Sequence, residues 1–178
     1  LKTRTSSPAL RAPAPNAEQL DEIFKAALRA PDHASLQPYR FLTIQGEALD
    51  KLGQLFLKAA LTKDPNVDEA KQKKLRNMPL RAPMIIVTLA VTQDHPKVPV
   101  EDQVMSAACA SHAIIQSAFA QGLGTIWRSG AMTQDPIVRA GLGCTDNEKI
   151  IGYIYIGRAL KVRAAPESDP APFVSNWG

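Results

Sequence analysis

The apolar positions near the start of the chain follow a helical period. Five of them between Leu20 and Leu28 recur at intervals of three and four residues, which predicts an amphipathic helix. Asn16 can cap its first turn, with Gln19 completing a capping box. Pro31 is expected to end the helix, because a proline cannot continue the hydrogen-bond ladder.

Similar patterns along the rest of the chain predict the remaining elements. Helices are expected over 49–59, over 101–121 and from Asp135-Pro136 to near Gly141 or Gly143, with a short surface helix within 62–78. Strands are expected over 40–45, 84–91, 125–128 and 149–156. This order predicts one α+β or α/β domain over residues 1–178, with an extended arm over 1–15 and a tail over 158–178.

The predicted helix over 101–121 consists mostly of alanine, serine and other small residues. Small side chains let a neighbouring backbone or a flat ligand approach closely, so we expect this helix at the centre of the domain or at a dimer interface. Cys109 within it is interpreted as a small buried hydrophobe. The tail carries Phe173, Val174 and Trp177, and apolar side chains beyond the last strand must pack somewhere, for which a partner subunit is one candidate.

Composition and charge narrow the class of protein. Hydrophobic residues make up 45% of the chain and charged residues 21%, as in ordinary globular domains. The net charge of +4 suits an anionic ligand but is too small to indicate nucleic acid. The apolar runs are too short to cross a bilayer, and we expect a cytoplasmic protein. The densest basic cluster, Lys71, Lys73, Lys74 and Arg76, is interpreted as a solvated face.

Several common catalytic motifs are missing from the sequence. It has no GxGxxG opening a βαβ unit, no GxxxxGK[ST] phosphate loop and no GxSxG nucleophile elbow. Its histidines, His33, His95 and His112, form no pair with metal-ligand spacing, so no metal site is expected.

Three segments combine polar and basic residues with apolar structure, and each has a purely structural explanation as well. Residues 4–6 are either a solvated terminus or an anion-binding arm. Residues 29–39 could hydrogen-bond a polar heterocycle, or Asp32 and Ser35 could simply satisfy the backbone of a turn. Arg128 ends a buried-looking strand and therefore requires either a ligand anion or a carboxylate of the protein.

Together these segments resemble the nitroreductase family, in its short bacterial NAD(P)H nitroreductase branch. The resemblance keeps its order and spacing over nearly the whole chain. The matching stretches are Arg29–Tyr39, Arg81–Val87, Lys97–Pro99, Met105–Ala107, Ala120–Gly130 and Asp169–Phe173.

The resemblance implies an α+β fold with a mainly antiparallel central sheet flanked by helices, and a homodimer with FMN bound at the subunit interface. By position it places nine residues at the cofactor. These are Arg4, Thr5 and Ser6 of the arm, Arg29, His33 and Ser35 of the loop, and Trp127, Arg128 and Ser129 along the flavin ring.

The chain departs from the family pattern at one position, and the match to a second family residue is ambiguous. The family arm usually reads Arg-Arg-Ser, and Thr5 stands at the middle position here. The basic residue that meets the FMN phosphate from the C-terminal side could be Arg158, Lys161 or Arg163.

The implied activity is hydride transfer from NADH or NADPH through flavin N5 to a small oxidant such as a nitroaromatic or a quinone, by ping-pong kinetics. Because the flavin carries this chemistry, no catalytic side chain is expected. An FMN-binding redox sensor or flavin carrier without efficient turnover is the alternative. The sequence does not distinguish NADH from NADPH or name the natural oxidant.

Overall fold

The computed structural model describes residues 2–161 and 163–178, so Leu1 of the predicted arm and Val162 of the predicted tail lie outside the described residues. Its centre is a sheet in which every pairing is antiparallel, with the order β1-β5-β3-β2 and with β4 also paired to β5. The strands are β1 (Leu10–Arg11), β2 (Tyr39–Gln45), β3 (Met84–Val91), β4 (Gly124–Arg128) and β5 (Glu148–Ala159).

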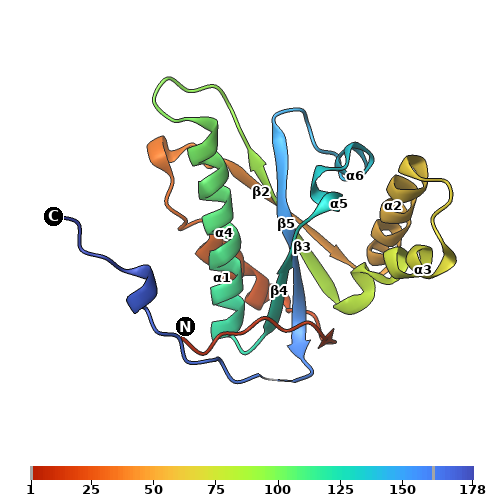
Figure 1. Ribbon diagram of the computed structural model, residues 1–178, viewed down its shortest axis with the longest axis horizontal. Helices are drawn as coiled ribbons and strands as arrows, with labels where there is room; N and C mark the ends of the chain where they lie inside the picture. The colour runs from red at the N-terminus through yellow and green to blue at the C-terminus, as the bar shows by residue number, and fades with distance from the viewer. Residues whose placement is uncertain (1, 162) are drawn as a thin grey trace.

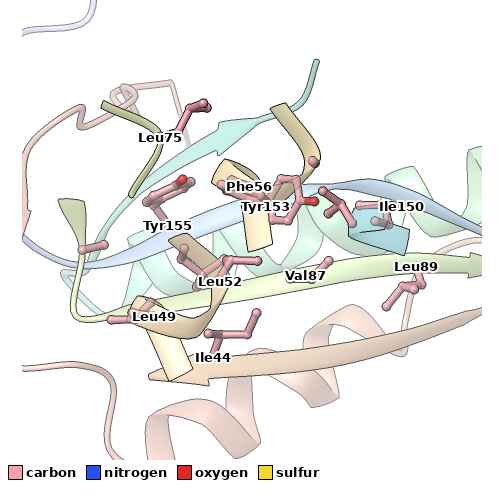
Figure 2. Packing of buried hydrophobic residues seen from close by; sticks show 14 of the residues in the cluster. Ile44, Leu49, Leu52, Phe56, Leu75, Val87, Leu89, Ile150, Tyr153 and Tyr155 are labelled. Carbon is pink, nitrogen blue, oxygen red and sulfur yellow. The ribbon is translucent and has the colours of Figure 1, made fainter. Parts of the chain in front are cut away.

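Helices cover both faces of this sheet (Figure 1). On one face lie α1 (Ala17–Ala27) and α4 (Val100–Ala120), and on the other α2 (Glu47–Lys63), α3 (Glu69–Asn77), α5 (Ala131–Gln134) and α6 (Pro136–Gly141). Each face has its own apolar core. Figure 2 shows the core under α2, where Phe56 packs edge-on against Tyr153 with ring centroids 5.5 Å apart.

The architecture confirms the expected α+β fold with a central antiparallel sheet between helices. The predicted capping box is present, since the Asn16 side chain accepts from the Gln19 amide and the Gln19 side chain accepts from the Asn16 amide. Asp135 caps α6 by accepting from Ile137 and Val138, as its pairing with Pro136 predicted. The short strand β1 and the helix α5 were not predicted.

The predicted central helix is α4, and its two sides differ. One side is buried against β3, β5 and α1, and includes Ala107, Ala110 and Ile114. The other side is open and carries Met105, which is 57% exposed, and Cys109. The expectation of a buried Cys109 is therefore wrong for the single chain, because the sulfur lies on the outward side of the helix. No helix within the described residues is long and apolar enough to span a membrane.

A buried ion pair joins β2 to the start of β5. The Arg40 guanidinium donates to both carboxylate oxygens of Glu148 and also to the Gly143 carbonyl. The Glu148 side chain is only 5% exposed, and its second oxygen also accepts from the Thr145 amide at 2.9 Å. The hydrogen bond from Arg40, helped by that amide, lowers the pKa of Glu148 to about 2, although burial alone would raise it.

Candidate functional site

The N-terminal arm does not run free in solvent. The Ser7 amide donates to the Thr125 carbonyl at 2.8 Å, and β1 pairs with the end of β5. These contacts hold Arg4 and Thr5 against the turn between α4 and β4, where they line a hollow of about 160 Å³ with Phe119, Gly122 and Thr125. Arg4 is half-buried there, whereas Ser6 is exposed and Ser7 anchors the arm.

Thr5 connects the arm to the chain that follows β5. Its hydroxyl donates to the Arg163 carbonyl at 3.4 Å, which joins the arm to the first part of the tail at one end of the sheet (Figure 1). Arg158, by contrast, lies within β5 opposite Arg11. Of the three candidate basic residues, Arg163 is thus the one whose backbone accepts a hydrogen bond from Thr5.

The end of β4 directs its side chains to both faces of the sheet. Trp127 packs on the α4 side, directly over Gly152, where an added methyl group would lie 2.1 Å from the indole Nε1. Arg128 points to the α2 side, with its guanidinium carbon 5.8 Å from the centre of the Tyr155 ring. The two side chains therefore lie on opposite faces of the sheet.

Arg128 lies at the inner end of a basic pocket that the sequence did not reveal. The pocket has a volume of about 450 Å³ and also includes Lys74 and Arg81. Lys74 is interpreted from the sequence as part of a solvated face. Its side chain is exposed, and it also lines this pocket. Burial raises the pKa of Tyr155, and the Arg128 and Arg81 guanidinium groups act in the opposite direction. Both cations are thus close enough to affect the Tyr155 hydroxyl.

The loop that follows α1 has an unusual backbone. Ala34, Ser35 and Gln37 have φ angles of +64°, +52° and +47°, a region that non-glycine residues rarely occupy. The Asp32 carboxylate holds the loop by accepting from the amides of Leu36 and Gln37. The structural interpretation of Asp32 is therefore correct. Strained backbone of this kind often occurs at ligand sites.

The predicted ligand residues of this loop point away from its own chain. Arg29, His33 and Ser35 are all exposed. The loop is tied to the first half of α4, because the Ser106 hydroxyl donates to the Pro31 carbonyl at 2.7 Å.

One chain does not bring the arm and the loop together. The loop contacts α4 at Ser106, whereas the hollow beside the arm reaches α4 at Phe119. At a rise of 1.5 Å per residue, these positions are about 20 Å apart along the helix. Figure 1 shows the loop and the arm at opposite ends of α4. Within a single chain, the nine predicted residues form separate groups.

Comparison with known proteins identifies the family. The family model described as "Nitroreductase family" matches residues 1–158. The chain belongs to the nitroreductase family. It is 42% identical over 177 residues to the Escherichia coli K12 protein named "Putative NAD(P)H nitroreductase YdjA", covering 98% of this chain and 96% of that protein.

Solved nitroreductase structures share the fold. The nitroreductase-like family protein from Bacillus cereus superimposes with a TM-score of 0.83 at 22% identity, covering 99% of this chain and 92% of that one. The FMN-dependent nitroreductase NfnB from Mycobacterium smegmatis, solved in complex with NADPH, superimposes with a TM-score of 0.75 at 16% identity. It covers 98% of this chain and 95% of the NfnB chain.

The residues of this nitroreductase-family chain fit an anionic, hydrogen-bonding cofactor. The Arg128 Nε is buried and has no hydrogen-bond partner among the described residues. Leaving a buried donor without an acceptor is costly, so a bound group with an acceptor oxygen or nitrogen would stabilise it. Arg4, which lines the separate hollow beside the arm, is a cation that suits a phosphate.

Proposed function

We propose that this protein is an FMN-dependent NAD(P)H oxidoreductase that reduces a small oxidant such as a nitroaromatic or a quinone. The observation that carries the proposal is the 42% identity, over 98% of the chain, to a relative named as an NAD(P)H nitroreductase. The FMN dependence and the NADPH complex of NfnB support the choice of cofactors. Bound FMN would supply hydride chemistry that no side chain of the protein can perform.

Each part of the site has a role in holding that cofactor. Arg4 would pair with the phosphate in the hollow at the end of α4. Arg163, whose backbone Thr5 holds beside the arm, would supply a second cation and compensate for the missing arm arginine. Arg128 would donate to the ring, where negative charge accumulates on reduction.

The activity is tested with purified protein supplemented with FMN. We expect a yellow protein that releases FMN and not FAD on denaturation, and that oxidises NADH or NADPH when menadione or a nitroaromatic is added. Flavin binding without oxidant-dependent NAD(P)H oxidation would favour the alternative, a redox sensor or flavin carrier. Absence of flavin after supplementation would contradict both.

The site is completed by a second copy of the chain in this proposal. Two α4 helices packed antiparallel through their open faces would bring the loop of one subunit to the arm of the other. This arrangement would cover Met105 and Cys109 and would give the exposed Arg29 and His33 a ligand to contact. Phe173 and Trp177 of the tail, 87% and 101% exposed, would also gain a surface to pack on.

We therefore expect a dimer whose FMN binding depends on association. Light scattering should give twice the chain mass of 19.3 kDa. Met105→Glu places a charge on the open face of α4 and should dissociate the dimer and release FMN together. Gln54→Glu adds the same charge at an exposed position of α2, on the other side of the sheet, and serves as the control. A monomer that binds FMN stoichiometrically would contradict this arrangement.

A further inference from the structure

The basic pocket at the end of β4 has a cationic mouth and an aromatic base. Lys74 and Arg81 are exposed at its mouth, and half-buried Arg128 lies deeper. Its base is formed by Phe56, Tyr153 and Tyr155, whose side chains Figure 2 shows on the α2 side of the sheet. The remaining lining residues are Met78, Ser129, Ala131 and Met132.

The positive charge of this pocket is not neutralised by the protein. No carboxylate lines it, and across the described residues Lys74, Arg81 and Arg128 form no side-chain hydrogen bond or ion pair. Asp135 in the adjoining groove already caps α6. Three cations around one cavity repel one another, and an anion bound between them would relieve that repulsion.

The surroundings of these cations favour an anion with an apolar body. The Tyr153 hydroxyl donates to the Met132 carbonyl, whereas the Tyr155 hydroxyl has no hydrogen-bond partner among the described residues. Ala131 and Met132 also line a larger groove of about 840 Å³ between α2, α3 and α6. That groove is largely apolar, with Val67, Leu75 and Ile137 among its lining residues. A ligand could therefore place an acidic group on the cations and an apolar part against the groove.

We propose that this pocket selects oxidants that carry a carboxylate, with aromatic carboxylates as the preferred class. The inference rests on the proposed function and adds a substrate class to it. The planar guanidinium group of Arg81 can pair with both oxygens of a carboxylate, and the Lys74 ammonium adds a second positive charge at the mouth. Lys74 and Arg81 determine specificity in this proposal, while Arg128 is shared with the cofactor.

The test compares 4-nitrobenzoate with 4-nitrobenzamide, which has nearly the same shape without the charge. In each turnover R–NO2 and NAD(P)H with one proton yield R–NO, NAD(P)+ and water, so two electrons pass to the nitro group. We expect kcat/KM to favour the carboxylate. Lys74→Gln and Arg81→Gln should each lower that preference about fivefold, mostly through KM, as for partly exposed charge pairs. Lys73→Gln, on the same helix but outside the pocket, should leave the preference unchanged.

Binding without turnover provides a second measurement. Calorimetric titration of the FMN-loaded protein with benzoate and benzamide, without NAD(P)H, should show tighter binding of benzoate that weakens with Lys74→Gln, Arg81→Gln and added salt. Equal binding of the two compounds would overturn the proposal. The proposal would also be overturned if Lys74→Gln and Arg81→Gln shifted the flavin midpoint potential without changing the preference for the carboxylate. In that case the two cations would act on the cofactor and not on the oxidant. Loss of NAD(P)H oxidation with the benzoate preference intact would reject the proposed function alone.

Discussion

Replacing Arg4 with alanine should weaken FMN binding about ten- to a hundredfold and leave the flavin midpoint potential almost unchanged. The proposed partner of Arg4 is the phosphate, which keeps its charge in both redox states. Loss of a charge-assisted hydrogen bond costs roughly 1.5–3 kcal/mol, and here that loss is equal for oxidised and reduced FMN. The measurement is the FMN dissociation constant together with the midpoint potential.

Arg128→Ala provides the contrast for this prediction. Arg128 is proposed to lie beside the flavin ring, where negative charge appears only on reduction. Removing the Arg128 side chain should therefore lower the midpoint potential. Slower oxidation of NAD(P)H should follow, because the interaction is stronger in the reduced state. Arg11→Ala, an exposed arm position outside the hollow, should change neither quantity.

The opposite pattern would reverse the two assignments. A shifted potential in Arg4→Ala, with only affinity changed in Arg128→Ala, would mean that Arg4 meets the ring and Arg128 the phosphate. No change in either variant would show that the residues matched to the family do not contact FMN here. Circular dichroism and light scattering must first show that both variants fold and associate normally.

Glu148→Gln should destabilise the protein by about 3 kcal/mol at pH 7. Removing one partner of a buried ion pair typically costs about 3–5 kcal/mol, and the lower end applies because the Arg40 side chain is 35% exposed and keeps contact with water. The glutamine side chain is neutral, so it lacks the negative charge that the Arg40 guanidinium and the Thr145 backbone amide stabilise in Glu148. Urea denaturation gives the free energy of unfolding directly.

The contribution of Glu148 should depend on pH. Its pKa is about 2 in the folded protein and near the ordinary value of 4.5 when unfolded. The unfolded state therefore binds the proton first, and the stabilisation is complete above pH 4.5 and is lost as the pH falls toward 2. The difference in unfolding free energy between Glu148→Gln and the original protein should narrow between pH 4.5 and 3. Glu167→Gln, at an exposed position in the tail, is the control and should not change the unfolding free energy at any of these pH values. If the difference between Glu148→Gln and the original protein stays constant with pH, the low pKa assigned to Glu148 is wrong.

Local signals were sufficient where one segment determines its own structure. The capping box at Asn16, the cap at Asp135 and the uninterrupted apolar run of β3 were all predicted correctly. In each case the deciding interaction spans a few residues, or the apolar pattern already shows which sides are buried. The weak strand β1 was missed because only pairing with β5, about 150 residues away along the chain, makes it extended.

For the site, the sequence alone determined which segments carry the polar and basic residues, and their order identified the family. The tertiary structure decided how these segments are combined. It placed Arg128 with Lys74 and Arg81 and separated it from Trp127, because alternate side chains of a strand face opposite sides of the sheet. It also placed the loop and the arm at opposite ends of α4 and left Cys109 outward. Such distances follow from how helices pack on a sheet, which the pattern within any one segment does not specify.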